Sequence, residues 1–165
     1  MTDLLTHVLV AAVLLAPVAW WIDRLHVRYV PLGMAGATLP DIAKVNNVVA
    51  RQQVADLLGV PFSWLPFHRL GGVVAVAIAV TLLFERGTRR TVFGVLLAGA
   101  GSHLFLDALI TRANGLTPPY LYPLSWWYPP SGDLYVSSDV WPAAVAVVAV
   151  VALLVVRRVT TATGE

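Results

Sequence analysis

The sequence contains no cysteine among its 165 residues. Disulfide bonds and thiolate metal sites are therefore excluded, and any metal site must use histidine, aspartate, glutamate or water. Charged residues are also scarce: they make up 12% of the chain, whereas a typical soluble domain has about 25%. Because so few charges cannot cover the surface of a water-soluble globule, the sequence predicts an integral membrane protein.

Lysine is nearly absent, since Lys44 is the only one and the other ten cationic residues are arginines. The net charge of +2 is too small to indicate a nucleic-acid partner. The mean hydropathy of +0.77 indicates instead that lipid surrounds much of the chain. We therefore expect contacts with membrane lipids and none with nucleic acid.

Hydrophobic segments predict an all-α fold, a polytopic transmembrane helical bundle. The second segment is short, bounded by Pro31 and Pro40, and barely long enough to cross half a bilayer. It is a candidate for a broken helix that lines a cavity, where irregular backbone is tolerated at membrane depth. The five segments run approximately over residues 4–22, 29–39, 70–84, 91–110 and 140–156.

A polar stretch over residues 41–69 separates the second and third segments. Its apolar residues recur at helical spacing, which predicts one short amphipathic helix at the membrane interface, ended by Gly59 and Pro61. Together, the hydrophobic segments and the polar stretch predict a single transmembrane domain over residues 1–158, followed by a flexible tail over residues 159–165.

The distribution of cations predicts the orientation, because loops rich in arginine and lysine stay on the cytoplasmic side. If the turn at residues 85–90 is cytoplasmic, alternation places the 41–69 stretch and the 111–138 loop on the opposite side. The cytoplasmic side then holds Arg24, Arg28, Arg86, Arg89, Arg90, Arg157 and Arg158. The other side holds Lys44, Arg51, Arg69 and Arg112.

Five ionisable residues fall at a similar depth on the non-cytoplasmic side in this topology. His103 and Asp107 are spaced i, i+4 and therefore share a helix face. An ionisable pair inside an apolar helix is costly to bury and is by default a candidate for function. The full set is His7, Asp41, His68, His103 and Asp107.

Histidine and carboxylate together suit a divalent metal, such as zinc, or manganese if oxygen ligands dominate. A metal with an open position can lower the pKa of a bound water toward about 7, which permits hydrolysis without a nucleophilic serine or cysteine. Structural roles stay open at each position: His7 as a solvated residue, Asp41 as a helix cap, His68 as an interfacial anchor, and His103 with Asp107 as a hydrogen bond between helices. Aromatic residues of the 111–138 loop are interpreted as a membrane-interface belt or as a lid.

Three short runs, together with the early His7, carry a resemblance to a known family: residues 36–41 (GATLPD), 67–69 (FHR) and 101–107 (GSHLFLD). They resemble the membrane-bound metal-dependent hydrolase family, also described as LexA-binding, inner-membrane-associated hydrolases. That family is similar in motif order to zinc-dependent phospholipase C. The resemblance extends from His7 to about residue 123. It implies hydrolysis of a phosphoester or lipid-like bond, with metal ligands His7, Asp41, His68, His103 and Asp107.

The sequence departs from the family pattern at two places. Members often carry a second histidine shortly after His-Arg, where this chain has residues 70–73 (LGGV), and a second aspartate where this chain has Ala43. Fewer donors leave open either one metal ion instead of several or a degenerate site.

We therefore expect an inner-membrane, metal-dependent hydrolase whose site faces the non-cytoplasmic side. Its substrate is a phosphoester or lipid-like ester, and Asp41 or Asp107 could act as the general base. The alternative is a non-catalytic membrane protein in which the histidine and aspartate side chains form a structural polar network or an ion path.

Overall fold

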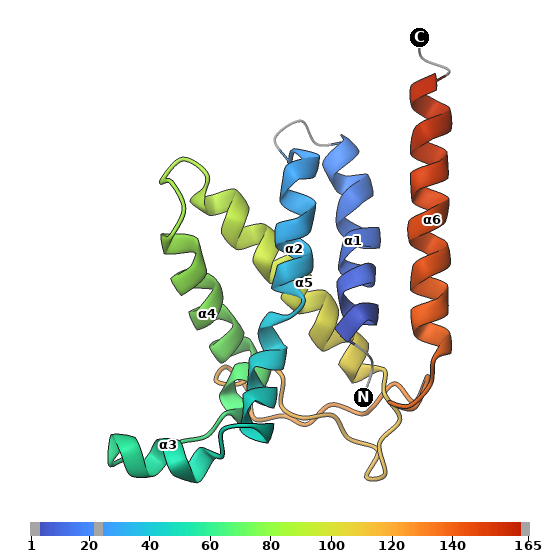
Figure 1. Cartoon of the computed structure of the whole chain (residues 1–165). Coiled ribbons are helices and arrows are strands. Elements are labelled where there is room, and N and C mark those ends of the chain that lie inside the picture. The colour runs from blue at the N-terminus through green and yellow to red at the C-terminus, as the bar shows by residue number, and fades with distance from the viewer. Residues whose placement is uncertain (1–3, 22–24, 163–165) are drawn as a thin grey trace.

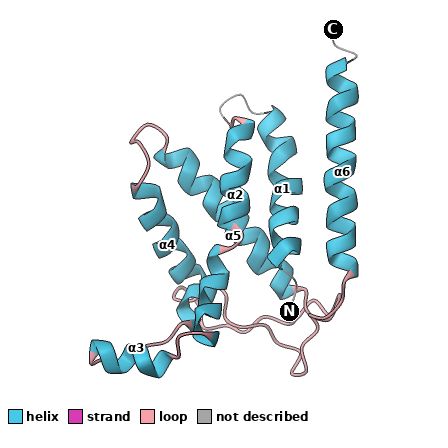
Figure 2. Ribbon diagram, viewed as in Figure 1, coloured by secondary structure: helices cyan, strands magenta, loops and turns pink. Residues whose placement is uncertain are grey.

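The computed structural model describes residues 4–21 and 25–162, and over these ranges it consists of helices joined by loops (Figure 2). The predicted all-α class is confirmed: the described ranges hold six α-helices, three short 3-10 helices and no strand beyond isolated bridges. The α-helices are α1 (Leu4–Trp21), α2 (Val30–Gly36), α3 (Arg51–Leu58), α4 (Leu70–Leu82), α5 (Arg89–Ala108) and α6 (Trp141–Ala162). The 3-10 helices are η1 (Val27–Tyr29), η2 (Leu39–Asn47) and η3 (Leu65–His68).

Three of the helices, α1, α5 and α6, are long and apolar enough to cross a membrane. Helix α4 is apolar but shorter, with 13 residues. Figure 1 shows α1, α2, α4, α5 and α6 running up and down in turn, as expected for a polytopic bundle. Most large apolar side chains of α6 are exposed, which a membrane protein tolerates because lipid covers them.

The second hydrophobic segment is a broken helix, as its length and prolines predict. Its seven-residue helix α2 has Pro31 in the first turn, and η2 begins with Pro40 in the same way. Proline suits the first turn of a helix, where its missing N–H leaves no partner unsatisfied. The chain therefore changes from α to 3-10 helix between Gly36 and Leu39, just before Asp41.

The short helix predicted in the polar stretch is α3, which projects sideways from the lower end of the bundle (Figure 1). It ends at Gly59, whose φ of +69° is a left-handed conformation that favours glycine. Leu57 is strongly exposed, so α3 presents apolar surface to its surroundings, as an interfacial helix does.

Helix α6 continues past Arg157 and Arg158, where we expected it to end, and includes residues 159–162 of the predicted tail. The hydroxyl groups of Thr160 and Thr161 donate hydrogen bonds to carbonyl oxygens three and four residues earlier, at distances of 3.0 Å. These bonds give both threonine hydroxyls a partner within the helix itself. Residues 163–165 of the predicted tail lie outside the described residues.

The backbones of α2 and α5 approach closely because glycines face each other. A Cβ atom at Gly99 would overlap the carbonyl oxygen of Gly33 and would lie 2.8 Å from the backbone nitrogen of Ala37. Likewise, a Cβ atom at Gly36 would overlap the carbonyl oxygen of Leu96. Small residues permit this contact between helices in a membrane, where packing drives association.

We predict that Gly99→Ala destabilises the bundle, because the added methyl group meets backbone that cannot rotate away. Overpacking of this kind costs about 1–3 kcal/mol. Gly101→Ala on the same helix is the matched control, since nothing lies within 4 Å of its Cβ position. Thermal unfolding in detergent should show a lower Tm for Gly99→Ala and an equal or higher Tm for Gly101→Ala. Equal melting of both variants would contradict the close contact.

The up-and-down arrangement also predicts which exposed positions share a side of the membrane. Because the chain has no cysteine, single cysteines at Asp56, Gly87, Asn114 and Thr161 can be labelled with a membrane-impermeant thiol reagent. Asp56→Cys and Asn114→Cys should react from one side, and Gly87→Cys and Thr161→Cys from the other. Labelling of Asn114→Cys and Gly87→Cys from the same side would show that α5 does not cross.

Candidate metal centre

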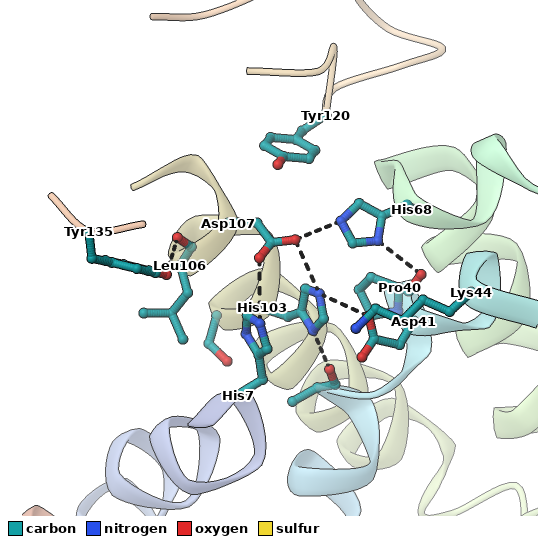
Figure 3. Close-up of polar contacts among 12 residues, drawn as sticks. His7, Pro40, Asp41, Lys44, His68, His103, Leu106, Asp107, Tyr120 and Tyr135 are labelled. Atoms are coloured by element: carbon teal, nitrogen blue, oxygen red, sulfur yellow. Dashed lines mark hydrogen bonds and ion pairs between the residues drawn. The ribbon is translucent and has the colours of Figure 1, made fainter. Parts of the chain in front are cut away.

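The structure brings together all five residues that the sequence singled out, although they come from four different elements (Figure 3). His7 lies in the first turns of α1, and Asp41 lies in η2 after the broken helix. His68 ends η3, and His103 and Asp107 lie one turn apart on α5. The cluster therefore joins segments that are up to 100 residues apart in the sequence.

Asp107 is at the centre of the cluster, because its carboxylate faces all three imidazoles. Its Oδ2 atom lies 2.8 Å from Nε2 of His68 and 3.5 Å from Nε2 of His103. Its Oδ1 atom lies 3.5 Å from Nε2 of His7. The rings of His7 and His103 stack, with their centroids 3.7 Å apart.

Backbone carbonyls orient two of the imidazole rings. Nδ1 of His103 donates a hydrogen bond to the carbonyl oxygen of Ala37 at 2.7 Å, and Nδ1 of His68 donates one to that of Pro40 at 3.0 Å. A carbonyl only accepts, so in both rings Nδ1 carries a proton and Nε2 points toward the carboxylates. This is how metal-ligating histidines are usually held by their surroundings.

Asp41 lies on the other side of His103. Its Oδ1 atom is 3.6 Å from Nε2 of His103 and forms an ion pair with Nζ of Lys44 at 2.6 Å. Nε2 of His103 thus lies between two carboxylates. It is buried, and it has no hydrogen-bond partner among the residues that the structure describes.

The cluster holds two carboxylates with little exposure to solvent, since the side chains of Asp41 and Asp107 are only 11% and 14% exposed. Burial by itself lowers the pKa of His68, but the hydrogen bond to Asp107 and the charges of both carboxylates raise it above its ordinary value of 6.5. Both ring nitrogens of His68 face acceptor oxygens, an arrangement satisfied by a protonated ring or by a cation at Nε2.

The side chains form two overlapping groups that could hold a metal ion: His7, His103 and Asp107, and Asp41, His68 and His103. Ligand atoms about 2.1 Å from a tetrahedral ion are about 3.4 Å from one another. The separations of 3.5 and 3.6 Å between Nε2 of His103 and the two carboxylates are close to that spacing. The donor set therefore fits a divalent cation.

A cavity of about 780 Å³ opens beside the cluster, and His7 and Asp107 form part of its wall. Three cations also line it, Lys44, Arg69 and Arg112. Sequence patterns relate these three cations to the orientation of the chain in the membrane and do not identify them as site residues. Their sequence positions were nevertheless a signal, since each follows a cluster residue by one to five places.

Tyr120 was also missed, because the 111–138 loop was interpreted through its aromatic content alone. The Tyr120 side chain is buried, and its ring lies 6.0 Å from that of His68. Its hydroxyl oxygen accepts a hydrogen bond from Nη2 of Arg112 at 3.1 Å. Burial and the charge of Asp107 raise the pKa of Tyr120 to about 12, so this hydroxyl is neutral at physiological pH.

Comparison with known proteins gives one match, to the family described as YdjM inner membrane protein, over residues 1–164. The chain belongs to this family. Neither the curated proteins nor the solved structures gave a match. Membership in this family agrees with the apolar helices, and the chain is a membrane protein. The family description does not assign a chemical role to the His/Asp cluster.

The cluster predicts that the purified protein binds a divalent metal ion and that His103→Ala abolishes this binding, because His103 belongs to both groups of donors. His26→Ala is the matched control, since His26 is the remaining histidine of the chain and is exposed before η1. Elemental analysis of protein in detergent should find near-stoichiometric metal in the wild type and in His26→Ala. Equal metal in His103→Ala would exclude the cluster as the site.

Proposed function

We propose that this protein is a membrane-embedded, metal-dependent hydrolase that acts on a phosphoester or a lipid-like ester. The observation that carries the proposal is the environment of His103. Its Nε2 atom is buried, has no hydrogen-bond partner among the described residues, and lies between two carboxylates at 3.5 and 3.6 Å. Burying an unpaired acceptor beside two negative charges is costly unless a cation sits among them.

The five donors support a single metal ion. In His103, Nδ1 is engaged by the carbonyl of Ala37, which leaves one lone pair, on Nε2. Because both groups of donors need this nitrogen, they are two descriptions of one site. Three imidazoles and two carboxylates suit zinc, and manganese is the choice if the oxygen atoms dominate. The ligands are His7, Asp41, His68, His103 and Asp107.

Held by these residues, a zinc ion would supply Lewis acidity and would lower the pKa of a bound water to about 7. The chain itself supplies the orientation of the donors and a base. Of the two candidates for the general base, Asp107 lines the cavity, while Asp41 is held by Lys44. Asp107 is therefore better placed to accept a proton from water in the cavity, a role it takes only where it acts as the base and not as a direct ligand.

The arginine distribution supports a site on the non-cytoplasmic side. The cluster lies at the end of the bundle away from the α4–α5 turn, which Figure 1 shows at the upper end. Arg86, Arg89 and Arg90 are at or beside that turn, and cytoplasmic loops collect such residues. The substrate then reaches the cavity from the membrane surface on the opposite side.

A structural polar network is the second candidate, and one contact favours it. His68 and Asp107 are already within direct hydrogen-bond distance, 2.8 Å. Such a bond links η3 to α5 with no need for a metal ion. The two candidates differ in what happens when the charge of Asp107 is removed and its shape is kept.

Asp107→Asn should lower the metal affinity by about tenfold or more, because the amide removes a negative ligand; even changes behind the ligands cost about 10–100-fold. Asp56→Asn on α3 is the matched control, since Asp56 is exposed and bonds only to Gln52 among the described residues. Metal titration by calorimetry measures both. If the cluster is only a structural network, the wild type binds no metal ion and the Asp107→Asn variant still folds.

Hydrolysis itself is tested by a screen of phosphodiesters, phosphomonoesters and carboxylic esters, offered both free and on lipids. We expect a chelator to abolish turnover and added zinc or manganese to restore it. Asp107→Asn should be inactive and Asp56→Asn fully active. Turnover that persists in the chelator and in Asp107→Asn would refute metal-dependent hydrolysis at this site.

A further inference from the structure

The cavity beside the metal centre has a cationic wall. Three of the residues that line it are cations, namely Lys44, Arg69 and Arg112. Of the described residues in the lining, Asp107 is the one that carries a carboxylate. The cavity volume of about 780 Å³ is within the usual range of small-molecule sites, about 300–1,000 Å³. A ligand in this cavity therefore meets both metal donors and positively charged side chains.

Arg112 is the cation with the least compensation. Its Nη2 atom donates to the carbonyl oxygen of Asp107 at 3.3 Å and to the hydroxyl of Tyr120 at 3.1 Å, and both acceptors are neutral. Its Nε atom is buried and has no hydrogen-bond partner within the described part of the chain. No described carboxylate forms an ion pair with Arg112. The guanidinium of Arg112 is therefore fixed in position and partly desolvated, and no described carboxylate compensates its charge.

Arg69 is held by aromatic rings and also lacks an ion pair with any described carboxylate. Its guanidinium carbon lies 5.3 Å from the ring centroid of Tyr122 and 5.9 Å from that of Trp126. Contacts with ring faces leave the N–H edges of a guanidinium free to bind an anion. Lys44 differs, because Asp41 already neutralises it and its side chain is 35% exposed.

We propose that Arg112, assisted by Arg69, binds the phosphate group of the substrate in this cavity. A guanidinium offers paired N–H donors that match two phosphate oxygens, and a carboxylic ester or an amide would leave those donors unpaired. The inference rests on the proposed function only in treating the bound molecule as a substrate. It narrows the substrate class to phosphate-bearing compounds, either lipids with a phosphate headgroup or soluble phosphoesters.

Binding is measured by calorimetry with two probes, inorganic phosphate and the short-chain lipid dihexanoyl phosphatidic acid. The full-length protein in detergent is used both as purified and after treatment with a chelator. Arg112→Gln should raise the Kd for phosphate about tenfold or more, as expected for the loss of a charged hydrogen-bond donor. Arg51→Gln is the matched control, because Arg51 begins α3 and does not line the cavity.

The two probes identify the source of the phosphate group. Much tighter binding of the lipid indicates a phospholipid headgroup, and equal binding of both indicates a soluble phosphoester; the Arg112→Gln effect supports the proposal in either case. Failure of the wild type to bind either probe overturns it. Equal weakening by Arg51→Gln also overturns it, because that result reflects general surface charge.

Arg69→Gln covers the case in which Arg112→Gln does not fold. Among the described residues the Arg69 guanidinium contacts aromatic rings and forms no ion pair, so this variant should melt like the wild type and still bind phosphate several-fold more weakly. If Arg69→Gln folds and binds phosphate as tightly as the wild type, the proposed role of Arg69 in phosphate binding is wrong. If the metal-loaded protein hydrolyses none of the screened esters but still binds phosphate, both with metal and after chelation, the enzyme is refuted and the anion site is retained.

Discussion

The close contact between the backbones of α2 and α5 determines the geometry of the whole centre. Gly99 allows the backbone of residues 33–37 to lie directly against α5. One turn further along α5, the carbonyl of Ala37 accepts the Nδ1 proton of His103. The broken helix then turns into η2, which carries Asp41 to the other side of the same imidazole. A membrane bundle can form such a contact because helix association there depends on close packing of small residues.

The composition of the cluster follows from the cost of burying charge in an apolar bundle. A single aspartate is costly to bury on an apolar helix, and the described contact that offsets this cost for Asp107 is the hydrogen bond with His68 at 2.8 Å. The second carboxylate, Asp41, brings its own cation, Lys44. Within the cluster, the described residues leave three buried atoms without a hydrogen-bond partner: Nε2 of His103, Nδ1 of His7 and Oδ1 of Asp41, the last of which pairs with Lys44. These unsatisfied atoms lie where the donor atoms have the spacing of metal ligands.

Sequence reasoning could predict the helices and the five cluster residues because these depend on local rules. Hydrophobic length gives the segments, proline gives the break in the second, and the i, i+4 spacing places His103 and Asp107 on one face. The alternation of sides then groups His7 and His68 with them. The 111–138 loop could not be predicted in this way, since its path is set by long-range backbone bonds such as that from Leu70 to the carbonyl of Tyr120. Tyr120 and the cationic wall were therefore missed.

That loop connects the two halves of the site. The Tyr120 ring lies beside His68, and its hydroxyl oxygen accepts a hydrogen bond from Arg112, whose Nη2 atom also reaches the carbonyl of Asp107. The acidic, imidazole-rich side and the basic side are thus held by one tyrosine and one turn of backbone. Opposite charges this close would pair directly if the side chains could reach, yet Arg112 bonds to a carbonyl and a hydroxyl instead. Arg112 therefore keeps its positive charge at the cavity that Asp107 also lines, and electrostatics favours a ligand there that itself carries negative charge.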